Sequence, residues 1–129
     1  MGKQGIENLL GKTLVKIKLD SNMRNIYFET SDGKAYNMFH SQDCCEDVSI
    51  EDVCGDLDDL IGSEILVAER VTSNKDPKHD PDRDSGHDSF TWTFFKLSTV
   101  NANVTIRWYG TSNGYYGEDA EVEECSIEN

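Results

Sequence analysis

The dipeptide Asp32-Gly33 constrains the fold of this chain more than any other feature. It separates two runs, 25–30 and 35–40, that are rich in aromatic and apolar side chains. Asp-Gly between such runs favours a type I′ turn, whose two central residues need positive φ, and therefore predicts a β-hairpin. The preceding run, 13–20, alternates apolar and polar side chains with the period of a half-buried strand. Together the three runs predict an antiparallel meander.

The second half of the chain also favours strands. Threonine and aromatic side chains dominate 89–100 and 103–110, which a short turn joins into a second predicted hairpin. Residues 63–71 alternate less clearly, and 120–127 alternates weakly with acidic residues that discourage edge pairing. Seven strands are therefore expected along the chain.

The segment from about 48 to 61 predicts a short helix instead. Ile50, Val53, Leu57 and Leu60 fall at helical spacing. Gly55 interrupts the segment, so two short helices with a kink are an equal alternative. The predicted fold class is accordingly α+β, with a twisted antiparallel sheet of six or seven strands and one short helical segment packed on one face.

A chain of 129 residues is expected to form a single domain, 1–129. Within it the composition changes abruptly at about 73–88. This segment holds both prolines, two of the three histidines and no large apolar side chain, so it predicts a mobile loop between strands.

The charge of the chain limits its partners. Twelve Lys plus Arg stand against 25 Asp plus Glu, a formal charge of −13, which argues against direct binding of nucleic acid. The same charge suits a basic protein surface, although solubility alone is the simpler explanation. No apolar run is long enough to span a bilayer, and no signal-peptide core follows Met1, so a cytoplasmic protein with no membrane partner is expected.

The stretch 40–47 is the first candidate site. It gathers an imidazole, two thiols and carboxylates between a predicted strand and the predicted helix: His40, Asp43, Cys44, Cys45 and Glu46. A zinc site would need a fourth ligand from Asp43, Cys54 or Cys125, and a nucleophilic thiol would be opposed by the neighbouring carboxylates. A structural role is the third reading, with one cysteine buried and the carboxylates capping the helix. We therefore assign no catalytic residue, no metal and no cofactor.

The second candidate site follows the second predicted hairpin. Aromatic rings, a guanidinium, a hydroxyl and an amide could stack on a planar ligand and hydrogen-bond its edges. The residues are Arg107, Tyr109, Ser112, Asn113, Tyr115 and Tyr116. In the alternative interpretation Trp108 lies in the core and the two tyrosines close the end of the sheet.

Four motifs carry a resemblance to a family of small, uncharacterised proteins found largely in bacteriophage and prophage genomes. They are HSQDCCEDV at 40–48, GDLDDLIG at 55–62, TWTF at 91–94, and IRWYG at 106–110 with SNGYY at 112–116. The resemblance extends from about Gly11 to Glu124. It implies no catalytic role, but small phage accessory proteins often bind and neutralise a host protein or a host immune signal.

These observations favour a non-enzymatic phage accessory protein that acts by binding in the host cytoplasm. The leading hypothesis is a counter-defence inhibitor that engages a basic host protein surface, in a complex that salt weakens. The alternative is a sponge for a small nucleotide signal, held between the 40–47 stretch and the turn at 112–116. A Cys/His-dependent enzyme or a zinc-binding domain is the third hypothesis.

Overall fold

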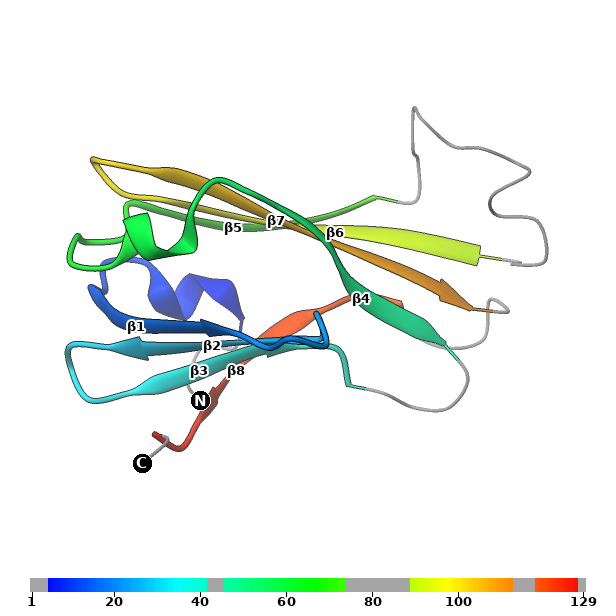
Figure 1. Cartoon of the computed structure of the whole chain (residues 1–129), viewed down its shortest axis with the longest axis horizontal. Coiled ribbons are helices and arrows are strands. Elements are labelled where there is room, and N and C mark those ends of the chain that lie inside the picture. The colour runs from blue at the N-terminus through cyan, green and yellow to red at the C-terminus, as the bar shows by residue number, and fades with distance from the viewer. Residues whose placement is uncertain (1–4, 42–45, 74–88, 113–117, 128–129) are drawn as a thin grey trace.

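The computed structural model describes residues 5–41, 46–73, 89–112 and 118–127. Two single 3-10 turns and eight strands make up these ranges (Figure 1). In chain order they are η1 (Ile6–Leu9), β1 (Leu14–Leu19), β2 (Asn25–Thr30), β3 (Ala35–Phe39), β4 (Asp47–Cys54), η2 (Leu57–Leu60), β5 (Val67–Ser73), β6 (Ser89–Ser98), β7 (Asn103–Ser112) and β8 (Glu121–Cys125).

The strands form two antiparallel sheets of four that face each other as two layers (Figure 1). The strand order is β1-β2-β3-β8 in one sheet and β4-β7-β6-β5 in the other. The α+β prediction, with one sheet of six or seven strands, was therefore wrong. In the described ranges the only helical elements are the two 3-10 turns.

The first half of the predicted helix at 48–61 belongs to a strand that was not expected from the sequence, β4. Val48 and Ile50 are buried and alternate as in any half-buried strand. A β-bulge between Ile50 and Asp52 then shifts the register and returns Val53 toward the core. The inserted residue turns a period of two into a spacing of three, which imitates a helix. Gly55, at φ +111°, ends the strand before η2.

The local strand predictions were more accurate. The hairpin around Asp32-Gly33 is confirmed as β2 paired with β3. The predicted type I′ turn was wrong, because Gly33 has φ +84° but Asp32 does not have a positive φ. The second hairpin is confirmed as β6 paired with β7 in an unbroken register of ten residue pairs. The predicted loop at 73–88 begins at the last residue of β5, and its remainder lies outside the described residues.

The core lies between the two layers. Phe28 and Met38 from the first sheet and Phe95, Ile106 and Trp108 from the second are fully buried. Trp108 therefore occupies the core, as the alternative interpretation of the second candidate site expected. η1 packs against β5 and β8 and buries Ile6 and Leu9. No helix in the described ranges is both long and apolar enough to cross a membrane.

The topology brings two distant parts of the chain to the same end of the sandwich. The chain leaves the first sheet after β3 and enters the second at β4, and it returns from β7 to β8. Phe39 at the end of β3 pairs with Glu121 at the start of β8, while Asp47 pairs with Thr111. The crossing segments 40–46 and 113–120 consequently connect the same two pairs of strands. Among the described residues of these segments, His40 and Asp119 are thereby held in contact.

Candidate functional site

His40 and Glu46 form a buried pair at this crossing. His40 Nε2 lies 2.8 Å from Glu46 Oε2, and their side chains are 7% and 0% exposed. On the other side of the ring, Nδ1 lies 2.7 Å from the backbone oxygen of Asp119. A carbonyl oxygen only accepts, so Nδ1 carries a hydrogen and donates it. Nε2 faces the Glu46 carboxylate, so the imidazole is engaged on both nitrogens.

Glu118 is the second buried carboxylate of the crossing, at 7% exposure. Thr91 on β6 donates its hydroxyl to Glu118 Oε1 at 2.9 Å, and Ser112 at the end of β7 donates to Oε2. Two hydroxyl donors on separate strands thus satisfy the two carboxylate oxygens. This arrangement offsets much of the desolvation that burial of a carboxylate entails.

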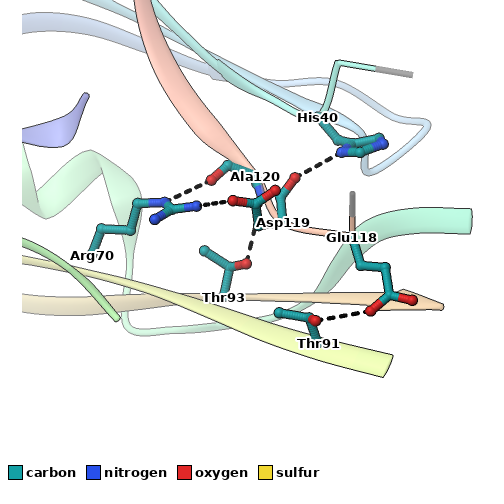
Figure 2. A network of polar contacts seen from close by, with 7 residues as sticks. All are labelled: His40, Arg70, Thr91, Thr93, Glu118, Asp119 and Ala120. Carbon is teal, nitrogen blue, oxygen red and sulfur yellow. Dashed lines mark hydrogen bonds and ion pairs between the residues drawn. The ribbon is translucent and has the colours of Figure 1, made fainter. Parts of the chain in front are cut away.

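Arg70 on β5 connects the returning chain to the second sheet (Figure 2). Its Nε donates to the backbone oxygen of Ala120 at 2.8 Å, and its Nη2 forms an ion pair with Asp119. Thr93 accepts a hydrogen bond from the Ala120 backbone N–H at 3.4 Å. Figure 2 shows these groups and His40 converging on the short segment 118–120 from both layers.

Gly110 explains how the returning chain can lie so close to β7. A Cβ at this position would stand 2.1 Å from the backbone oxygen of Glu118 and 2.9 Å from a methyl group of Val48. Only glycine leaves room for that approach. The glycine of the 106–110 motif is therefore required by packing.

A different kind of surface opens between the free edges of the two sheets. A groove of about 660 Å³ lies between β5 and β8, beside η1. Four acidic residues are among those that line it, Glu7, Glu69, Asp119 and Glu121. Of these only Asp119 forms an ion pair within the described part of the chain, with Arg70. The groove is therefore a region of concentrated negative charge.

Comparison with known proteins places the chain in a family. The model of a domain of unknown function (DUF7448) matches residues 7–122. This protein belongs to that family. The search of curated proteins found no match, and the search of solved structures found none either. The part of the resemblance that expected a family of unknown function is thereby confirmed, whereas the match does not test the phage origin or the four motifs.

The candidate residues of this DUF7448 domain fall into separate places. His40, Glu46 and Ser112 lie at the crossing end, within the two hydrogen-bonded clusters that meet at 118–119. Arg107 and Tyr109 have the opposite strand parity to Ser112 and lie on the outer face of β7. Asp43, Cys44, Cys45, Asn113, Tyr115 and Tyr116 lie outside the described residues.

The outer face of β6 and β7 carries the aromatic part of the second candidate site. Tyr109 packs on Trp92 with ring centroids 4.5 Å apart, and Phe90 lies 6.1 Å from Tyr109. The Arg107 guanidinium lies 5.2 Å from the centroid of Trp92, in a cation–π contact. Its Nη2 is 3.7 Å from Asp52 Oδ2.

Metal ligation of the His40 stretch receives no support from the described cysteines. Cys54 ends β4 and Cys125 ends β8, so each lies at the end of its strand remote from the crossing. No group of three or more His, Cys, Asp or Glu side chains suited to a metal occurs in the ranges that the structure describes.

Sequence reasoning missed Arg70, Thr91, Thr93, Glu118 and Asp119. One signal was present, because Thr91 and Thr93 share strand parity with the buried Phe95 and Leu97. A polar residue on a core-facing position needs an internal partner. The partner of Thr91 is Glu118, which lies in a polar segment where nothing in the sequence marks it as buried.

Proposed function

We propose that this protein acts by binding a basic surface of another protein, without catalysis. The observation that supports this proposal is the acid-lined groove between β5 and β8. Three of its carboxylates, those of Glu7, Glu69 and Glu121, have no ion-pair partner in the described residues. Lysine and arginine side chains of a partner would supply the missing counter-charge, and the −13 net charge would steer the encounter.

The polar cluster at the crossing supports the same proposal, because its functional groups are already paired within the protein. The hydrogen-bonding atoms of His40 and Glu118 are occupied by internal partners. A general base or a nucleophile must have an atom available to the substrate. We therefore assign the cluster to stability and the groove to binding.

The biological part of the proposal rests on the resemblance of the motifs to phage and prophage proteins. In it the protein is a phage accessory factor in the host cytoplasm, and its partner is a host defence protein with a basic surface. Expression of the protein should then raise phage plating on a host that carries the targeted defence and leave plating unchanged on a host without it.

The direct test is retention of host proteins on the immobilised, full-length chain at low salt. A triple variant, Glu7→Gln, Glu69→Gln and Glu121→Gln, removes three groove charges. A control variant, Asp20→Asn, Asp58→Asn and Asp59→Asn, removes the same charge from exposed positions that do not line the groove.

The expected result is a host protein retained by the native chain and by the control, but lost with the groove variant and at high salt. The proposal fails if no protein is retained. It also fails if all three chains retain the same proteins equally.

A further inference from the structure

β5 differs from the other three strands that lie at sheet edges. The edges of the two sheets are β1 and β8, and β4 and β5. Bulges interrupt β1 and β4, and β8 carries three exposed glutamates, Glu121, Glu123 and Glu124. Bulges and charges of this kind protect edges from pairing with other chains. β5 pairs with β6 in an unbroken register over seven residues.

β5 carries two charged residues: Arg70 is engaged elsewhere, and the exposed Glu69 is acidic and would attract a basic segment. Arg70 is held inward by the Ala120 oxygen and by Asp119. Next to it Val71 exposes 45% of its surface. The groove runs along this same edge, because Ala68, Glu69, Arg70 and Val71 all line it.

We propose that β5 is the docking edge, and that an extended basic segment of the partner adds to it as a fifth strand of the second sheet. This inference rests on the proposed function and specifies how the partner binds. Main-chain hydrogen bonds to the edge would provide affinity, and alternate side chains of the segment would provide specificity.

The inner face of the added strand determines one half of its sequence. Side chains pointing inward from a strand beside β5 would overhang the groove toward the acidic residues Glu7 and Asp119. Lysine or arginine at every second position would meet these carboxylates. An acidic or apolar inner row would leave the carboxylates unpaired and would bind poorly.

The outer face determines the other half. The register places Val71 beside Phe94 and Ser73 beside Trp92, so the outer side of β5 continues the aromatic rows of β6 and β7. The ring centroids of Trp92 and Phe94 are 6.3 Å apart. Apolar side chains on the outer face of the added strand would cover the exposed Val71 and extend these rows. The segment that fits therefore alternates basic and apolar residues.

The test uses a blocked peptide of seven residues, the length of β5, that alternates arginine and valine. Its binding to the full chain is followed by titration calorimetry, and amide hydrogen exchange is followed by NMR. Bound peptide should slow exchange of backbone amides within 68–72 by about tenfold or more, because new hydrogen bonds would cover them. The same peptide with alternate amides N-methylated should not bind.

Two matched variants locate the edge. Val71→Lys places a charge against the apolar outer row of the added strand and should weaken binding by about tenfold. Val15→Lys makes the same change at a valine of similar exposure, 49%, on β1 and should leave binding unchanged.

The remaining outcomes overturn the inference in distinguishable ways. Binding without protection of β5, or with protection of β8 instead, would refute the docking edge and leave the proposed basic partner intact. Equal binding of the N-methylated peptide would refute strand addition. Concentration-dependent protection of β5 without peptide would assign the edge to a second copy of the chain. Failure of the peptide to bind would refute the inference, and the proposed function would fall only with the separate loss of host-protein retention.

Discussion

The crossing end and the groove both contain several carboxylates, but they use them in opposite ways. At the crossing, Glu46 and Glu118 are buried and each is hydrogen-bonded within the fold. In the groove, Glu7, Glu69 and Glu121 are exposed and have no ion-pair partner in the described ranges. The first group stabilises the native state, because removal of a partner leaves a desolvated charge. The second group is expected to contribute little to stability, as exposed side chains on a binding surface do.

The largest effect is expected on the free energy of unfolding, where two adjacent carboxylates, Glu46 and Asp47, should differ. Glu46→Ala should lower the free energy of unfolding by about 3–5 kcal/mol, because it leaves His40 buried without its partner. Asp47→Ala removes a carboxylate whose side chain is 71% exposed and which pairs with Arg24, and should change stability by less than about 1 kcal/mol. Denaturant unfolding of both variants measures the difference. Equal losses would mean that the buried pair contributes no more than the surface pair.

The second expected effect concerns the close approach at Gly110. Gly110→Ala should lower the free energy of unfolding by about 1–3 kcal/mol or more, because the new Cβ would collide with the Glu118 backbone. Gly33→Ala is the control, since Gly33 has positive φ but no neighbour within 4 Å of the added atom, and strain alone should cost about 1–2 kcal/mol. A tolerated Gly110→Ala would show that the returning chain can move away from β7.

The same comparison shows how far sequence reasoning reaches in this fold. Hairpins were predictable because their signals are local: Asp32-Gly33 forces one turn, and the period-two runs on both sides set the register. The strand β4 was not predictable, because the bulge between Ile50 and Asp52 spaces its apolar side chains as they would be spaced in a helix. Division into two sheets depends on which strands pair at long range, and β3 pairs with β8 across some eighty residues, which no local pattern records.

The candidate site was predictable only in part for the same reason. His40 and Glu46 stand six residues apart and were grouped by their chemistry. Their connection to Asp119 spans 79 residues and follows from the two crossings lying together. The acid-lined groove is assembled from η1, β5 and β8, each of which contributes one acidic residue, and from the segment before β8, which contributes Asp119. Single acidic residues are unremarkable in a chain with 25 of them.

A smaller effect is expected in the groove. Glu7→Gln, Glu69→Gln and Glu121→Gln should each change the free energy of unfolding by no more than about 0.5 kcal/mol, as for other exposed substitutions. Thermal unfolding of the single variants and of the triple variant measures this. A loss of several kcal/mol in the triple variant would show that the groove carboxylates take part in the fold, and the contrast with the crossing end would disappear.

The smallest effect comes from an exposed ion pair, which tests whether burial rather than charge explains the contrast. Lys12 Nζ lies 2.5 Å from Asp32 Oδ2, and the two side chains are 36% and 38% exposed. The hydrogen bonds from Lys12 and Thr30 lower the pKa of Asp32 from 3.8 to about 2.

A carboxyl whose pKa is lower in the folded state stabilises the fold fully above the unfolded pKa, and this contribution is lost as the pH falls toward the folded value. The difference in unfolding free energy between the native chain and Asp32→Asn should therefore be constant near neutral pH and should shrink as the pH falls below about 4 toward 2. Because water screens this pair, the difference should remain well below that of Glu46→Ala at every pH. A difference as large as that of the buried pair would mean that the charge itself, and not its burial, determines the stability of the crossing end.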